Sequence, residues 1–166
     1  GLAMGALMAF VITGNAMAAA GTIELGSIYP TEQVNEKYSA SDKLIVEYSV
    51  YDQHNSKIVL ESGGDTSIGS IYAKSKSDIT VDSVGNTTIG SVSSSGYGGT
   101  IDITSGETTS TGAISISNPN KYGGGNAGGE TINVGGKNIS IDAGTGYGVS
   151  VRGGYYGFSK ETTANI

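Results

Sequence analysis

The stretch DTSIGSI at residues 65–71 recurs as NTTIGSV at residues 86–92, so that Ile68 and Ile89 are equivalent. A spacing of 20–50 residues between copies of one short unit is typical of solenoids, in which each coil buries its apolar row against the neighbouring coils. Within the first copy, only Gly69 and Ser70 separate Ile68 from Ile71, which breaks the alternation of a strand. We therefore expect Gly69 to form a corner that turns both isoleucines inward.

Two interleaved series of short β-branched segments continue this unit. One series runs on through ISI at 114–116 and 139–141, and the other comprises ITV at 79–81, IDI at 101–103, INV at 132–134 and VSV at 149–151. Stacked in parallel coils, these segments predict two inward ladders. Their members are Ile68, Ile89, Ile114 and Ile139 in the first ladder, and Ile79, Ile101, Ile132 and Val149 in the second. The stretch 118–129 lengthens one coil and is interpreted as an inserted loop.

The composition also indicates strands rather than helices. Among 166 residues there are 28 Gly, and 17 Ile and 11 Val stand against 5 Leu; β-branched side chains of this kind pack well on pleated sheets. We predict an all-β fold, a parallel β-helix (β-solenoid) of about four coils. The alternatives are an antiparallel sandwich or meander, which also has regularly spaced short strands, and a disordered Gly/Ser-rich region.

Residues 1–20 carry no charge and are interpreted as the remnant of a secretory signal peptide. An apolar core at 6–12 is followed by the small residues of a cleavage region, with Ala16, Ala18 and Ala20 at its key positions. A membrane anchor or an ordinary buried helix are the alternatives. Export is the expected consequence, and the absence of Cys means that disulfides do not stabilise the exported fold.

Residues 21–64 differ in character from the repeats. Residues 44–51 alternate cleanly, and the turn-rich 52–56 separates them from a second apolar run at 57–60. We interpret this segment as a hairpin that serves as an N-terminal β cap, because the end of a solenoid exposes unpaired strand edges. The coils then occupy residues 65–166. Another coil begins at 153–158, so the natural protein is expected to continue past Ile166.

No catalytic residue, metal site or cofactor is predicted. The G-x-G-x-x-G match at Gly123, Gly125 and Gly128 precedes a strand, whereas a phosphate site needs a following helix. The single histidine, His54, has no Cys or second His with which to bind zinc. Arg152 is interpreted as a surface cation at a strand end. Nine basic residues against fifteen acidic ones leave no basic patch for nucleic acid.

Four aspartates on predicted outer faces, Asp78, Asp82, Asp102 and Asp142, allow two interpretations. They are solvated surface groups, or a pair such as Asp78 and Asp102 acts as general acid and base. The candidate surface-contact residues are tyrosines next to glycines in predicted turns, because exposed tyrosines offer rigid contact area for sugars or proteins; the alternative is that they cover the coil core. These tyrosines are Tyr97, Tyr122, Tyr147, Tyr155 and Tyr156.

The signal-like segment, together with a Cys-free ladder of T-x-I-G-S-[IV] and I-x-[IV] strands from about Thr66 to Gly154, resembles the passenger region of bacterial autotransporter (type V secreted) adhesins. The resemblance implies a right-handed β-helix on the outside of a Gram-negative outer membrane, followed in the full gene by a C-terminal translocator. Contact with a membrane would then involve only the signal segment or that translocator, and the export machinery would be a partner.

These observations predict a non-enzymatic protein, secreted or held at the cell surface. It would act as a stalk or adhesin that contacts glycans or proteins of a host or neighbouring cell. Two alternatives stay open: a β-helical carbohydrate-active enzyme, such as a polysaccharide lyase or hydrolase, and a passive structural module of the cell envelope.

Overall fold

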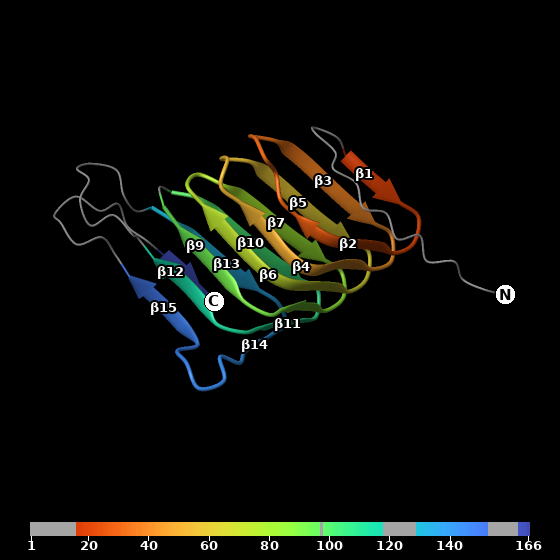
Figure 1. Cartoon of the computed structure of the whole chain (residues 1–166). Coiled ribbons are helices and arrows are strands. Elements are labelled where there is room, and N and C mark those ends of the chain that lie inside the picture. The colour runs from red at the N-terminus through yellow and green to blue at the C-terminus, as the bar shows by residue number, and fades with distance from the viewer. Residues whose placement is uncertain (1–15, 97, 118–128, 153–162) are drawn as a thin grey trace.

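The computed structural model describes residues 16–96, 98–117, 129–152 and 163–166. In these residues all regular elements are strands, and each pairs in parallel with strands of the neighbouring coils, the strands at the two ends of a sheet on one side only. The predicted parallel β-solenoid is therefore confirmed, with about five turns rather than about four. Figure 1 shows the coils stacked from the red N-terminal strands to the blue C-terminal ones.

One wall of the solenoid is a seven-stranded sheet, here called sheet A. Consecutive strands of this sheet are one coil apart, and the step along the sequence is 21 or 22 residues from the first to the fifth strand, as in the pairing of Asn35 with Lys57 and of Lys57 with Asp78, and 31 and 32 residues in the last two steps. In spatial order the strands are β1 (Ala16–Ala19), β3 (Asn35–Ala40), β5 (Lys57–Ser62), β7 (Asp78–Ser83), β10 (Thr100–Ser105), β13 (Thr131–Gly135) and β16 (Thr163–Asn165).

The other two walls belong to one bent sheet, called sheet B. In the N-terminal coils a single bent strand covers both walls: β2 (Ile23–Ile28), β4 (Leu44–Asp52) and β6 (Thr66–Lys74). In later coils the strand divides at the bend. The first lane then contains β8 (Thr87–Ile89), β11 (Thr108–Thr111) and β14 (Asn138–Ile141), and the second lane contains β9 (Val92–Ser95), β12 (Ile114–Ser117) and β15 (Val149–Arg152).

The bend between the two lanes is where the glycine corner was predicted. Ile68 and Ile71 on either side of Gly69 are both buried, which confirms that both side chains point inward. Gly90 and Gly112 occupy the same corner in the next two coils. A Cβ on Gly90 would overlap the carbonyl oxygen of Gly69, and one on Gly112 would overlap that of Gly90. Only glycine allows the backbones of successive coils to approach this closely.

The core consists of inward columns, and the sequence predicted one of them well. Ile79, Ile101 and Ile132 are register partners on sheet A, as expected, and Ile58 extends the column. In the other ladder Ile68 and Ile89 are register partners as predicted, but three assignments were wrong: Ile114 and Val149 are register partners in the second lane, and Ile139 pairs with Thr109 in the first lane. The sequence showed two series of apolar segments, whereas the structure has three walls. The Thr-rich strands of the first lane have too few apolar residues to be recognised as a third series.

Buried hydroxyl pairs line the corner between sheet A and the first lane. Ser62 bonds Thr66 at 2.8 Å, Ser83 bonds Thr87 at 2.6 Å, and Thr109 donates to Ser105 at 3.1 Å. Each pair spans the corner of one coil and satisfies two hydroxyls that would otherwise be buried without a partner, which is costly. Serine and threonine in these strands are thus partly core residues.

The hairpin prediction for residues 21–64 was wrong. β4 lies in sheet B between β2 and β6, and β5 lies in sheet A between β3 and β7. The alternating segment and its apparent return strand are successive walls of one coil, because the turn 53–56 leads into a different sheet. The segment therefore forms coils in register with the later ones, which accounts for the additional turn.

Two further predictions concerned the signal segment and the inserted loop. Residues 1–15 lie outside the described residues, while Ala16–Ala19 form β1 beside β3; cleavage near Ala16, Ala18 or Ala20 stays a prediction. The inserted loop lengthens one coil step of sheet A. Thr100 pairs with Asp78 of the preceding coil and with Thr131 of the following coil. That second step is longer than the first, while the stretch 118–128 itself lies outside the described residues.

We predict that Gly90→Ala lowers the free energy of unfolding by about 1–3 kcal/mol, the usual cost of forcing atoms into a packed site. The matched control is Gly26→Ala, since Gly26 lies at the same corner of the first coil and a Cβ there would have no atom within 4 Å. That variant should be neutral or slightly stabilised. Urea unfolding of both variants measures the difference, and equal effects would contradict the close-approach argument.

Candidate binding surface

A ladder of three tyrosines lies on the outer face of the second lane. Tyr29 follows β2, Tyr51 lies in β4 and Tyr72 lies in β6, so the three occupy equivalent positions in consecutive coils. The ring centroids of Tyr29 and Tyr51 are 5.0 Å apart with planes tilted by 33°, and those of Tyr51 and Tyr72 are 5.0 Å apart with planes at 21°. The distance matches the spacing of neighbouring strands, so the coil repeat itself stacks the rings.

The tyrosine hydroxyls are held by hydrogen bonds. Tyr51 Oη donates to Gln53 Oε1 at 3.2 Å, and Gln53 Nε2 donates to Tyr29 Oη at 3.3 Å. Tyr72 Oη and Ser95 Oγ are 2.7 Å apart. Burial of the phenol, followed by the neighbouring tyrosines and Asp52, raises the pKa of Tyr51. The Tyr51 hydroxyl is therefore neutral at physiological pH.

Serines continue the ladder and flank it. Ser93, Ser115 and Ser150 take the place of tyrosine in the next coils. Beside this column, and nearer the corner, runs a second one in which Ser49 pairs with Ser27 and with Ser70. We call these two columns together the hydroxyl face. Its members are Tyr29, Tyr51, Tyr72, Ser93, Ser115 and Ser150 in one column and Ser27, Ser49, Ser70 and Ser91 in the other.

Of the predicted contact tyrosines, only Tyr147 lies among the described residues, and it is not part of the hydroxyl face. Tyr147 is 79 % exposed, in the connection between β14 and β15, and Tyr97, Tyr122, Tyr155 and Tyr156 lie outside the described residues. Sequence reasoning missed the ladder, although a signal was present. The ladder positions 29, 51 and 72 are separated by the same coil step as the repeated stretches. That signal was obscured because Tyr29 and Tyr51 were assigned to a cap.

The outer aspartates do not form the pair considered from the sequence. Asp78 is opposite Thr100, and Asp102 is opposite Thr80, so these two carboxylates are out of register. Asp102 instead accepts a hydrogen bond from Asn133, whose Oδ1 accepts one from Asn165 at 2.6 Å. Asp142 accepts a hydrogen bond from the backbone N–H of Gly144 at 3.0 Å, within its own turn.

A different pair of carboxylates does meet on sheet A. Glu61 and Asp82 are register partners and line a shallow hollow together with Ser39. Lys37 Nζ lies 2.7 Å from Glu61 Oε1, and this hydrogen-bonded ion pair lowers the pKa of Glu61. Glu61 is thus held in its ionised form, whereas a general acid must keep its proton near neutral pH. Within the described residues, no group of three or more His, Cys, Asp or Glu side chains is placed to hold a metal ion.

Two acidic side chains are buried near the N-terminal end of the core. Asp52 accepts hydrogen bonds from Ser56 N and Ser56 Oγ, both at 2.8 Å, and from Ser77 Oγ, so that it fastens the turns that follow β4 and β6. The backbone N–H of His54 also donates to Asp52, at 3.1 Å, and places His54 in that turn as predicted. Glu36, 7 % exposed, occupies the inward position beside Ile58 and accepts a hydrogen bond from Tyr38 Oη at 2.8 Å.

No protein-family model, curated protein or solved structure matches this chain. Among the residues that the structure describes, no helix is long and apolar enough to cross a membrane. The function is therefore inferred from the fold and from the chemistry of its faces.

We predict that Glu36→Gln stabilises the protein at pH 7 and has little effect at pH 4. Burial is the main cause that raises the pKa of Glu36 above its ordinary value of 4.5, and the charge of Asp52 adds to it, although the bond from Tyr38 opposes the shift. The folded state therefore favours the protonated carboxyl. Its stabilising contribution is present below pH 4.5 and is lost as the pH rises through the folded-state pKa.

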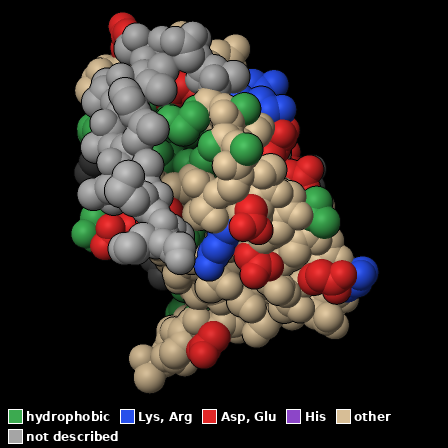
Figure 2. Space-filling view, turned by 90° about the vertical axis from the view of Figure 1, so that its right-hand side faces the viewer, with side chains coloured by type: hydrophobic (Ala, Val, Ile, Leu, Met, Phe, Trp, Pro, Cys, Tyr) green, Lys and Arg blue, Asp and Glu red, His purple; other side chains and the backbone are tan. Residues whose placement is uncertain are grey.

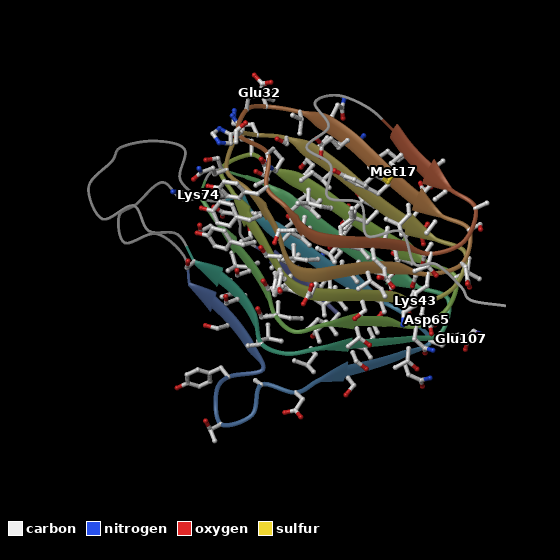
Figure 3. All side chains as sticks on the ribbon, turned by 45° about the vertical axis from the view of Figure 1, so that its right-hand side comes forward. Met17, Glu32, Lys43, Asp65, Lys74 and Glu107 are labelled. Atoms are coloured by element: carbon white, nitrogen blue, oxygen red, sulfur yellow. The ribbon has the colours of Figure 1, made fainter. Side chains whose placement is uncertain are left out.

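The measurement is urea unfolding of both proteins at the two pH values. Glu32→Gln is the control, because Glu32 is an exposed glutamate of the neighbouring turn (Figure 3). A gain in stability at pH 4 as large as at pH 7 would show that ionisation of Glu36 is not the cause.

Proposed function

We propose that the chain is part of an exported, non-enzymatic surface protein that acts as a stalk and adhesin. Its second-lane hydroxyl face would contact glycans or proteins of another cell. The observation that supports this most directly is the stacked tyrosine ladder, continued by serines along one side of the coils. Tyrosine and serine together provide rigid amphipathic area and adaptable hydrogen bonding, the combination used by antibody binding surfaces.

The architecture fits the role of a stalk. In a solenoid each coil contacts only its neighbours, so length can be added coil by coil without changing the core. The same repetition gives a long side wall with a repeated pattern of side chains. The resemblance to autotransporter passengers supports a location outside a Gram-negative outer membrane, reached with a signal segment and a C-terminal translocator.

The main alternative is a β-helical carbohydrate-active enzyme, and its most favourable site is the hollow lined by Glu61 and Asp82. The ion pair with Lys37 holds Glu61 as a carboxylate, so Glu61 could serve only as the base or nucleophile of such a pair and the general acid would have to be Asp82. A passive envelope module is the other alternative, and it requires no ligand at all.

The test is binding of the purified chain to arrays of glycans and of host-matrix proteins. We expect at least one ligand, and we expect Tyr51→Ser/Tyr72→Ser to weaken it about tenfold, since buried aromatic anchors contribute most to an interface. Tyr147→Ser is the control, being an exposed tyrosine outside the hydroxyl face. Serine is the natural residue of this column in later coils, so the double variant should fold.

Three outcomes would count against the proposal. Cleavage of a polysaccharide on the array, lost in Glu61→Gln, would favour the enzyme. No ligand on either array would favour the passive module. A ligand whose binding depends on Tyr147 and not on Tyr51 or Tyr72 would place the contact surface elsewhere.

A further inference from the structure

The hydroxyl face differs in charge from the outer side of sheet A. The chain contains 15 acidic and 9 basic residues, yet neither column of this face includes an Asp or Glu. Among the acidic residues nearest to it in sequence, Asp52 is fully buried, while Glu47 and Glu32 are exposed, Glu47 at the corner beside Tyr48 and Glu32 in the turn after Tyr29.

Acidic side chains are concentrated on the other surfaces. Glu61, Asp82 and Asp102 lie on the outer side of sheet A. Asp65 and Glu107 are found near Lys43 at the corner where sheet A leads into the first lane (Figure 3). Figure 2, which views the molecule from the side of those turns, shows acidic and basic side chains close together there. A polyanion would be repelled by these surfaces, whereas it would meet no acidic side chain within the two columns of the hydroxyl face.

Two lysines border the hydroxyl face on its far side from the corner. Lys74 lies beyond Tyr72 and Ala73 at the end of β6, so its side chain projects from the same outer surface as Tyr72. Lys76 follows in the turn, where its backbone N–H donates to Asn55 Oδ1 at 3.0 Å. Both lysines are exposed, and neither forms an ion pair with a described residue. Their charges are therefore available to an anionic ligand next to the tyrosine ladder.

We propose that the hydroxyl face, with Lys74 and Lys76 at its border, binds a strand of acidic glycan that runs along the solenoid axis. This inference rests on the proposed function and specifies its ligand. The tyrosine oxygens accept hydrogen bonds from the sugar hydroxyls, the serine hydroxyls donate to and accept from them, and the two ammonium groups pair with carboxylates of the glycan. Because the columns repeat at every coil, they complement a linear polymer that repeats its own hydroxyl groups.

A glycan suits this face better than an acidic peptide. Stacking covers the ring faces of Tyr51 on both sides, so the ladder offers ring edges and hydroxyls rather than apolar pockets for side chains. The partners of the ladder in later coils are serines, which again supply hydroxyls only.

The test measures binding of the full chain to polygalacturonate, with neutral dextran and poly-glutamate as comparison polymers. We expect binding to polygalacturonate that weakens with added salt and exceeds binding to either comparison polymer. Lys74→Ala/Lys76→Ala should weaken it about three- to tenfold, in line with the modest contribution of exposed charge pairs. Lys43→Ala is the matched control, since Lys43 is an exposed lysine at the opposite corner (Figure 3).

Tyr51→Ser/Tyr72→Ser should weaken binding of polygalacturonate about tenfold, as expected for aromatic anchors, and Tyr147→Ser should leave it unchanged. The lysine variants alter only side chains at the surface, so they keep the test valid if the tyrosine variant proves unstable.

Equal binding of dextran would overturn the charge argument, and equal binding of poly-glutamate would reduce the effect to non-specific attraction. Binding that is unaffected by both double variants would overturn the assignment of the site. If the chain binds a matrix protein through Tyr51 and Tyr72 but does not bind polygalacturonate, the adhesin proposal stands and the glycan inference fails.

Discussion

The structure depends on parallel backbone pairing between coils at a nearly constant step along the sequence. Each strand satisfies its N–H and C=O groups with the coil before and the coil after. A slip of one position would turn every inward side chain outward, so the step tolerates almost no variation within the walls. Where the chain is longer, as between Thr100 and Thr131, the additional residues are confined to a connection between walls and the register of the sheets is kept.

The constant step also determines which residues can occupy the corners between the walls. Between the lanes of sheet B, successive backbones approach so closely that Gly69, Gly90 and Gly112 follow one another without a Cβ. At the corner from sheet A, the hydroxyls of Ser62, Ser83 and their threonine partners satisfy one another's hydrogen-bonding capacity. The high glycine and serine content is thus a consequence of the geometry of the turns, and it is compatible with a close-packed core.

The sequence was sufficient for the fold class, because the recurrence of DTSIGSI as NTTIGSV reports the coil step directly. It was also sufficient for the column from Ile79 to Ile132, where apolar residues recur in each coil. The sequence was insufficient where an inward column changes between polar and apolar residues from one coil to the next. Thr109 is followed by Ile139 in one such column, and Glu36 is followed by Ile58 in another. Recognising residues 21–64 as coils required the register itself, since a turn into a new wall and a hairpin turn look alike in sequence.

The tyrosine ladder shows that a contact surface on a solenoid is best found by comparing equivalent positions in successive coils, rather than by looking for single exposed residues. Tyr29, Tyr51 and Tyr72 are inconspicuous one by one, and only equivalence of position brings neighbouring rings to 5.0 Å. Their stacking covers both ring faces of Tyr51 and places the hydroxyl groups in a row, which the serines of later coils prolong. The face therefore keeps one chemical character along its length although its residues change. Selectivity on such a face depends on the spacing of the hydroxyls and on the charges at its border, because two straight columns contact a ligand along its length rather than enclose it.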